Sequence, residues 1–357
     1  MNKKILIISY NFPPIVGGIE TYAKYLINYF EKENIKCIYP EKKMPINAYL
    51  RAFSMVKFSI KVLLKIIFKK YDIIHLTNFN LWIIAFTYSL IHKKTKFIIN
   101  LWGLELVYKN KKGFLPFLHK IFVPIGLIQK QKRFIFLTSS TASNKLASQS
   151  GINQKRVRTI PLGVPKEDIM PLTKKVIFKK YFLFSGRVTE RKGLSWFAEN
   201  ILPEFPEYKL IITGSMIEKN ELKKTLDIKN TEWLGRVSKK DLIKLRQEST
   251  AVIIPNIFQE NNSDFEAYGF VTIESVANSS LVVASNYQGL ADSLVKGKLG
   301  FLAEPSDSSS WLETLNKVIK IEKNEKIKII NKRLTYIKNN LLWDDIFKET
   351  NNLYNSF

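Results

Sequence analysis

The chain has 357 residues, of which 46% are hydrophobic and 13% aromatic. This length suits two domains, and the apolar content excludes global disorder. A single cysteine, Cys37, excludes an intrachain disulfide framework, and the formal net charge of +25 points to an anionic partner such as nucleic acid, anionic lipid or a phosphorylated substrate.

The first apolar run, from Lys4 to Ser9, predicts a strand that leads into a loop containing Gly17 and Gly18. From Ile19 to Phe30 the apolar residues recur at helical spacing. The glycine pair therefore places bare backbone at a helix N-terminus, where N–H groups bind anions. An ordinary turn explains the pair equally well. The fingerprint G-x-G-x-x-G is absent here, which weakens a dehydrogenase interpretation.

A helix predicted from Ser54 to Tyr71 has a lysine at every fourth position: Lys57, Lys61, Lys65 and Lys69. The remaining positions are largely apolar, so the helix has a lysine stripe along one side and is apolar over most of its remaining circumference. A solvated surface helix and an interfacial helix on anionic lipid both explain this pattern. Residues 109–133 again place apolar residues between two basic clusters. The two segments together favour peripheral contact with an anionic membrane surface.

No Lys, Arg, Asp or Glu occurs between Ile73 and His92, so this segment resembles a membrane span. Polar residues such as His75 and Asn78 interrupt it, however. The segment therefore predicts a strand followed by a buried helix.

Later strands are predicted from β-branched and apolar runs bounded by glycine or polar residues. They are Phe97–Leu101, Phe134–Thr138, Tyr181–Gly186 and Lys209–Gly214. Residues 157–164 predict a linker between domains, and Ser238 predicts a helix N-cap.

A basic turn follows the strand that ends at Gly186. Arg187 comes next, then Lys192 and Gly193, and a helix begins at Leu194. Two cations at a strand-to-helix turn suit a diphosphate. Taken alone, such a turn is more often solvated surface.

Residues 251–284 contain a strand, a polar loop, a helix and a second strand, which predicts a right-handed crossover on a parallel sheet. Ligands bind at the carboxyl ends of such strands. Glu266 in the loop and Glu274 in the helix are eight positions apart, with Gly269 between them. Solvated surface charge is the simpler explanation of one such pair, but the basic turn upstream favours a binding site.

Together these segments resemble the retaining glycosyltransferases of family 4, which have the GT-B fold. The resemblance is specific from Tyr181 to Leu302 and looser in the first half. It implies two Rossmann-like, doubly wound α/β domains facing a cleft. The implied boundaries are 1–164 for an acceptor-binding domain, 165–338 for a nucleotide-sugar-binding domain and 339–357 for a helix that returns to the first domain.

The resemblance also implies the roles of the candidate residues. Glu266 would orient the donor sugar, Glu274 would hold the ribose, and Arg187 and Lys192 would stabilise the leaving diphosphate. The remaining donor-binding candidates are Gly17, Gly18, Gly186, Gly214, Arg236, Val237, Gly269, Phe270 and Val271. No metal or other cofactor is expected, because the two basic residues would neutralise the diphosphate.

One departure from the family concerns Trp102, which stands where a histidine near the reacting sugar is common. An indole can donate and stack but cannot transfer protons near neutrality. Glu105 is a candidate acceptor contact or base, and a plain surface glutamate is an equally good interpretation.

The predicted activity is transfer of a sugar, with retention, from a UDP- or GDP-sugar to a lipid-linked or cell-surface polysaccharide acceptor. The expected location is cytoplasmic, on the inner face of the cytoplasmic membrane. A sugar-nucleotide epimerase of the same fold is an alternative. A nucleic-acid-binding protein is a third possibility, but the lysine stripe lacks interleaved aromatic residues on its own face, so no nucleic-acid partner is expected.

Overall fold

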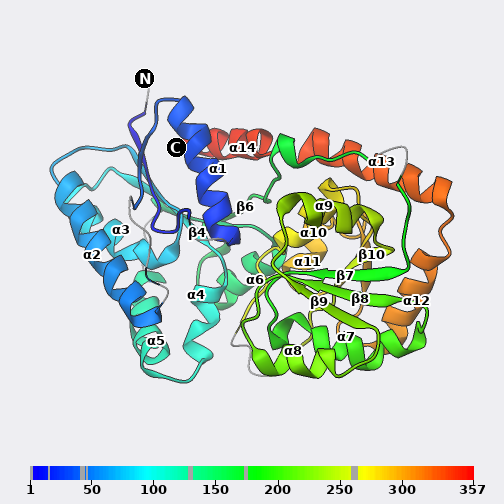
Figure 1. The fold of residues 1–357 in the computed structure, drawn as a ribbon. Coiled ribbons are helices and arrows are strands. Elements are labelled where there is room, and N and C mark those ends of the chain that lie inside the picture. The colour runs from blue at the N-terminus through cyan, green and yellow to red at the C-terminus, as the bar shows by residue number, and fades with distance from the viewer. Residues whose placement is uncertain are drawn as a thin grey trace. The chain divides into compact units, whose positions relative to one another are not determined.

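A computed structural model describes residues 3–14, 17–40, 45, 47–127, 132–172, 176–258 and 264–357. Contacts divide the chain into two compact units (Figure 1). Unit 1 comprises Met1–Leu162, Asn261–Ala267 and Trp343–Phe357, and unit 2 comprises Gly163–Glu260 and Tyr268–Leu342. A short internal segment and the C-terminal helix therefore belong with the N-terminal unit.

Unit 1 contains a six-stranded parallel sheet in the order β2-β1-β3-β4-β5-β6. Its central strands are buried along nearly their whole length, which explains their continuous apolar sequences. The strand order reverses between β1 and β3, where the carboxyl ends of a doubly wound sheet form a crevice. The strands are β1 (Ile5–Ile8), β2 (Lys36–Ile38), β3 (Ile73–Leu76), β4 (Lys96–Leu101), β5 (Phe134–Thr138) and β6 (Val157–Thr159).

The helices of unit 1 are α1 (Gly18–Lys32), α2 (Ala48–Ile66), α3 (Trp82–Ile91), α4 (Leu104–Val107), α5 (Phe114–Leu127), α6 (Thr141–Gln149) and α14 (Trp343–Asn355). The apolar face predicted for α1 is confirmed, since Tyr22, Leu26 and Phe30 are buried. Helix α14 packs on α1 through aromatic rings: Trp343 stacks on Tyr25 with ring centroids 5.8 Å apart. This aromatic contact attaches the end of the chain to unit 1.

The helix predicted to be buried after β3 is buried on one side only, so this prediction is wrong. Ala85 and Tyr88 of α3 are buried, but Leu90 and Ile91 are 54% and 60% exposed. An apolar run indicates which side chains avoid water but not whether the protein covers every face of the helix. Among the described residues, no helix has the length and apolar character needed to cross a membrane.

The basic and apolar segment 109–133 forms α5 over Phe114–Leu127, and its residues 128–131 lie outside the described part of the chain. The predicted linker 157–164 begins with strand β6, which pairs with β5 in the first sheet. The first part of unit 1 ends at Leu162, so the chain enters unit 2 within the last residues of that segment.

Unit 2 also has a six-stranded parallel sheet, in the order β12-β11-β10-β7-β8-β9. Its strand order reverses between β7 and β10. The strands are β7 (Tyr181–Ser185), β8 (Lys209–Thr213), β9 (Thr231–Gly235), β10 (Ala251–Ile254), β11 (Val282–Ser285) and β12 (Phe301–Ala303).

The helices of unit 2 are α7 (Leu194–Asn200), α8 (Lys219–Leu226), α9 (Lys239–Glu248), α10 (Phe270–Ala277), α11 (Gly289–Ser293), α12 (Ser308–Ile319) and α13 (Lys323–Asn340). The core includes Phe182, Phe197 and Trp311. The predicted N-cap is confirmed, because the Ser238 hydroxyl accepts a hydrogen bond from the Asp241 N–H at 3.1 Å. Two doubly wound α/β units thus confirm the predicted fold class.

Candidate functional site

The candidate site in unit 2 lies at the carboxyl ends of β7 and β10, where the strand order reverses. Gly186 and Arg187 directly follow β7, and Arg187 is exposed. Lys192 is half-buried and ends a short 3₁₀ helix, Glu190–Lys192, directly before α7. The predicted basic turn is therefore at the edge where parallel sheets bind ligands.

Gly193 brings this basic turn close to the end of β10. Its φ is +64°, and a Cβ added there would stand 2.0 Å from the carbonyl oxygen of Pro255. No other residue fits without moving the backbone of one loop. The chain between Lys192 and α7 is thus held against the residues that follow β10.

The loops after β7, β8 and β9 are also joined to one another. The Gly186 N–H donates to the Thr213 carbonyl at 2.9 Å, and the Gly214 N–H donates to the Gly235 carbonyl at 2.8 Å. Gly235 is followed directly by Arg236, which is exposed, and by half-buried Val237. The structure therefore brings the candidates Gly186, Gly214 and the Arg236–Val237 pair to one edge of the sheet.

Helix α10 begins after Gly269, whose φ is +80°. A Cβ at this position would lie 2.4 Å from a methyl group of Leu290, so the left-handed turn and the close packing both require glycine. Phe270 and Val271 form the first turn of α10, at the positive end of the helix dipole. Such amides suit an anionic group of a ligand.

Glu274 of α10 forms an ion pair with Arg246 of α9, and the Arg246 Nη2 lies 3.3 Å from the Glu274 Oε2. The side chain of Glu274 is 37% exposed, whereas that of Arg246 is only 5% exposed. Arg246 also donates to Asn278 at 2.8 Å and to Ser185, the last residue of β7, at 3.4 Å. This guanidinium therefore connects the β7 end with the helix that contains Glu274.

Burial lowers the pKa of Arg246, and the adjacent Glu274 raises it. A guanidinium stays protonated in proteins, so it supplies a fixed positive charge beneath the glutamate. The sequence does not identify Arg246, because it is one of several basic residues on α9. The available signal is its place four residues after Leu242, on the side of α9 that faces the sheet.

Glu266 belongs to unit 1 by its contacts, whereas Glu274 belongs to unit 2. The neighbours of Glu266 hold its segment against unit 1. The Ala267 carbonyl accepts hydrogen bonds from the hydroxyls of Ser139 and Ser143, both at 3.3 Å. The structure therefore does not bring the two glutamates together within one unit, although they lie on one continuous crossover in the sequence.

Gly17 and Gly18 are also in unit 1, between β1 and α1. Gly17 is the N-cap of α1, and a Cβ there would stand 2.4 Å from a carboxylate oxygen of Glu20. Glu20 in turn accepts a hydrogen bond from the Asn11 side chain at 2.8 Å. The glycine pair therefore lies beside the crevice of the first sheet, with an acidic side chain at the helix N-terminus.

Trp102 and Glu105 form a buried turn after β4. The Trp102 indole donates to the Thr77 carbonyl at 2.8 Å, and Glu105 accepts from the Trp102 backbone N–H. Burial raises the pKa of Glu105 to about 7, although its backbone hydrogen bonds lower it. Glu105 thus accepts a hydrogen bond that holds this turn. Because its side chain is buried, the interpretation of Glu105 as a surface glutamate is wrong.

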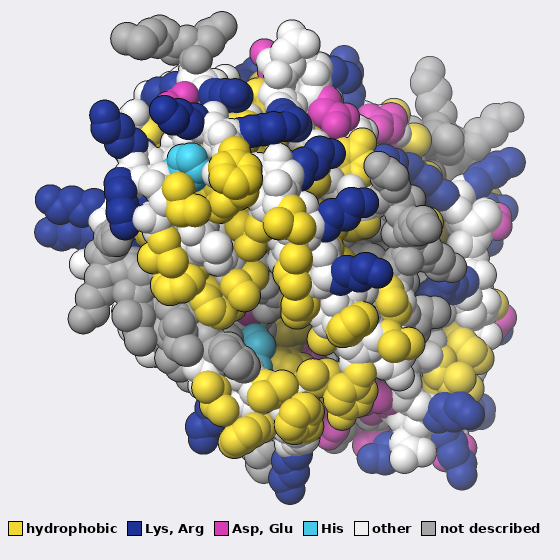
Figure 2. All heavy atoms as spheres, turned by 90° about the vertical axis from the view of Figure 1, so that its left-hand side faces the viewer, with side chains coloured by type: hydrophobic (Ala, Val, Ile, Leu, Met, Phe, Trp, Pro, Cys, Tyr) yellow, Lys and Arg dark blue, Asp and Glu magenta, His cyan; other side chains and the backbone are white. Residues whose placement is uncertain are grey.

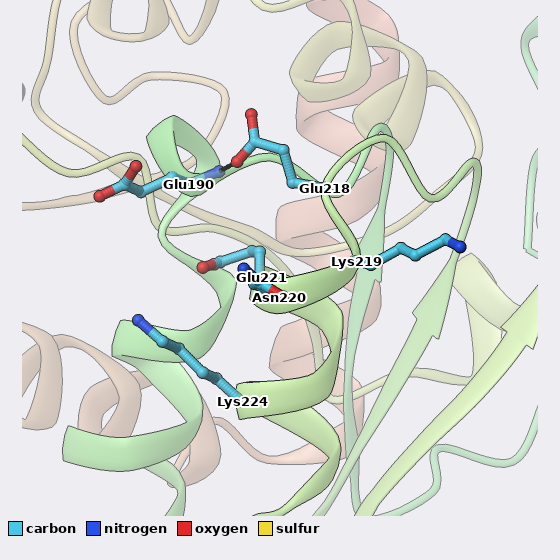
Figure 3. Close-up of a pocket in the computed structure, with 6 residues that line it drawn as sticks. All are labelled: Glu190, Glu218, Lys219, Asn220, Glu221 and Lys224. Carbon is cyan, nitrogen blue, oxygen red and sulfur yellow. Dashed lines mark hydrogen bonds between the residues drawn. The ribbon is translucent and has the colours of Figure 1, made fainter.

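A separate cavity of about 430 Å³ in unit 2 is lined by Glu190, Glu218, Lys219, Asn220, Glu221 and Lys224 (Figure 3). Two of its carboxylates already accept hydrogen bonds from backbone N–H groups at helix starts. Glu218 accepts from the Glu190 N–H at 2.8 Å, and Glu221 accepts from the Ser195 N–H at 2.9 Å. The lining has three carboxylates against two lysines, so its net negative charge makes this cavity a poor site for a diphosphate. Among described residues, no group of three or more His, Cys, Asp or Glu side chains could hold a metal.

Comparison with solved structures defines the fold class first. Sucrose-phosphate synthase from Thermosynechococcus elongatus matches with a TM-score of 0.78 over 99% of both chains, at 14% sequence identity. Anabaena HepE in complex with UDP matches with a TM-score of 0.74 over 99% of this chain and 100% of that chain, at 15% identity. The chain therefore has the GT-B fold of these structures.

Sequence comparisons then point to a particular family of domains. Residues 167–335 match the model of the family Glycosyl transferases group 1, and most of these residues lie in unit 2. The capsular polysaccharide biosynthesis glycosyltransferase CapM of Staphylococcus aureus is 24% identical over 188 residues, which cover 49% of this chain and 45% of CapM. The matches to the first curated relatives span less than half of the length of those relatives.

Proposed function

We propose that this protein is a retaining glycosyltransferase of family 4, of the hexosyltransferase type, which uses a nucleotide diphosphate sugar. One observation supports this most: Arg187, Lys192 and the first turn of α10 lie at the switch point of the unit 2 sheet. Fixed cations and helix amides are what a departing diphosphate requires. A group 1 domain over the same residues supports the same activity.

In this proposal Arg187 and Lys192 stabilise the diphosphate as the bond to the sugar breaks, so no metal ion or other cofactor is required. Glu274 accepts hydrogen bonds from the ribose, and its orientation is fixed by Arg246. Glu266 binds hydroxyls of the donor sugar. The amides near Gly17, Gly18, Phe270 and Val271 contribute further donors. The Trp102 indole already donates to the Thr77 carbonyl, so it has no proton left for the substrate.

The proposed donor is a UDP- or GDP-sugar, and the proposed acceptor is a lipid-linked or cell-surface polysaccharide. The UDP in the HepE complex supports a uridine nucleotide, and the name of CapM supports a polysaccharide acceptor. The proposed location is the cytoplasmic face of a bacterial membrane, with Lys57, Lys61, Lys65 and Lys69 facing anionic lipid.

Thermal unfolding with UDP, GDP and ADP tests the donor site, because a ligand that binds only the folded protein raises the melting temperature. A ligand at a hundred times its Kd adds about 2.7 kcal/mol. We expect one nucleotide to stabilise the protein, and the absence of any shift would contradict the site. Turnover of the matching nucleotide sugar without acceptor would instead indicate an epimerase.

A further inference from the structure

One side of unit 1 exposes an unusual number of large apolar side chains. They come from α2, from Phe68 directly after it, and from α3 and α5, and α3 packs against both of the other helices. Figure 2 shows hydrophobic side chains gathered on this side of the molecule, with lysine and arginine side chains around them. We call these residues the three-helix face: Tyr49, Leu50, Phe53, Val56, Ile60, Leu64, Phe68, Ile83, Phe86, Leu90, Ile91, Phe114, Phe117 and Ile121.

The exposure on α2 is systematic. Phe53, Ile60 and Leu64 are 71%, 55% and 73% exposed and recur at helical spacing. The opposite side of the helix packs on the core through Val62 and Ile66. Helix α2 is therefore apolar on its solvent side as well as on its core side. Monomeric soluble proteins rarely expose apolar patches of this extent unless the patch binds something.

The charged side chains of the three helices themselves all have one sign. Helices α2, α3 and α5 contain no Asp or Glu, and between residues 47 and 127 the only acidic residues are Asp72 and Glu105. Glu105 is buried, and Asp72 accepts a hydrogen bond from the Lys4 N–H. Lys57, Lys61 and Lys65 are exposed beside the apolar residues of α2. A binding partner that matches the three-helix face is therefore both apolar and negatively charged.

We infer that the three-helix face enters the headgroup boundary of an anionic lipid leaflet, with its aromatic and aliphatic side chains in the acyl region. Lysine side chains can keep their charged ends at the phosphates while their stems lie along apolar surface. A second copy of this chain fits less well, because a two-fold interface would place one basic face against itself. The inference extends the proposed function by specifying how the enzyme reaches a lipid-linked acceptor, but lipid binding itself needs no activity.

Vesicle flotation of the full chain tests this inference. We expect binding to vesicles of phosphatidylcholine with phosphatidylglycerol, and weak binding to phosphatidylcholine alone. Replacing Lys57, Lys61, Lys65 and Lys69 by glutamine should weaken binding on the order of a thousandfold at low salt, since each lysine near the surface contributes about fivefold. Unchanged vesicle binding by that variant would contradict the inferred attraction between these lysines and anionic lipid.

Insertion is tested by the combined variant Phe53→Gln, Phe86→Gln and Phe117→Gln, which places one polar change on each helix. We expect it to lose vesicle binding even at low salt, whereas the matched variant Phe258→Gln, at a 60% exposed site in unit 2, should bind as wild type. The nucleotide-induced rise in melting temperature should persist in both variants and shows that they fold.

Tryptophan fluorescence measures how deeply the three-helix face enters the lipid leaflet. A Phe53→Trp variant should be quenched by brominated lipid, and a Phe258→Trp variant should not. Wild-type vesicle binding by the triple variant, or a concentration-dependent dimer that the triple variant abolishes, would overturn the inference. Vesicle binding without any nucleotide-induced shift would instead leave this inference intact and contradict the proposed function.

Discussion

The two units share one architecture but differ in how polar residues are used at the sheet. In unit 1 the polar groups near the strand ends are buried and bonded to each other, as in the chain from Tyr354 through His75 to Asn100. In unit 2 the corresponding edge has exposed Arg187 and glycine-rich loops. Buried, satisfied polar groups contribute to a specific fold, whereas exposed cations contribute little to stability. The comparison therefore assigns the unit 1 network to structure, and exposed Arg187 in unit 2 supports the proposal that this edge binds a ligand.

The largest expected effect concerns the unit 2 edge. Lys192→Ala and Arg187→Ala should each lower sugar transfer by about 10²–10³-fold, because each removes a charge that stabilises the developing diphosphate. The melting temperature should stay within a few degrees of wild type. Lys219→Ala, in the acidic cavity of the same unit, is the control and should retain full transfer. Normal transfer by both site variants would contradict the comparison.

A second effect is a hidden pH dependence in unit 1. Burial lowers the pKa of His75 from 6.5 to about 4 and raises the pKa of Glu105 from 4.5 to about 7. Below pH 6.5 the unfolded chain protonates His75 more readily than the native protein, so stability falls as pH drops. Glu105 has the opposite sign, since the native protein binds its proton more tightly and stability rises as pH drops from 7 to 4.5.

These two effects oppose each other in nearly the same pH window, so removing one should reveal the other. Glu105→Gln should lose up to about 3 kcal/mol of unfolding free energy between pH 7 and pH 4, at roughly 1.4 kcal/mol per pKa unit. His75→Asn should gain stability over the same interval from a lower starting value. Urea unfolding at several pH values measures both slopes, and two slopes of equal sign would refute this account.

The third effect concerns the link between the β7 end and Glu274. Arg246→Met removes the donor that serves Asn278 and the Glu274 carboxylate, so it should destabilise unit 2 by about 1–3 kcal/mol. Water reaches the partly exposed Glu274, which keeps the cost below that of a fully buried charge. Nucleotide affinity should fall about tenfold with the lost orientation. Lys244→Met, at an exposed site on the same helix, is the matched control, and equal affinity in both variants would remove the positioning role.

The sequence predicts the strands well because parallel strands buried on both faces leave continuous apolar runs. Phe134–Thr138 is predicted with both of its ends, and the helix start at Leu194 is also confirmed. Arg246 was not predicted because its role depends on a contact with α10, 28 residues later in the chain. Sequence spacing also suggests that Glu266 and Glu274 are one pair, but the contacts of Ala267 attach the first glutamate to unit 1.

The exposed side of α3 was missed for a different reason. An apolar segment without charges is compatible with a core helix and with a helix that binds an external apolar phase. Only the packing of Ala85 and Tyr88, with Leu90 and Ile91 on the other side, separates the two. The exposed apolar side of α3 is therefore recognised from the fold and cannot be predicted from the periodicity of the sequence.

The smallest effect sharpens the structural assignment of unit 1. Tyr354→Phe keeps the ring that packs against Phe30, at a centroid distance of 5.2 Å, and removes only the hydroxyl bonded to His75. The loss should be about 1 kcal/mol, because the imidazole nitrogen then remains buried without that partner. Calorimetry should show a small decrease in melting temperature. The affinity for nucleotide, measured by titration calorimetry, should not change. The reason is that every contact that the proposal assigns to the diphosphate and ribose in unit 2 is intact. A weaker nucleotide affinity would mean that the buried network of unit 1 also supports binding.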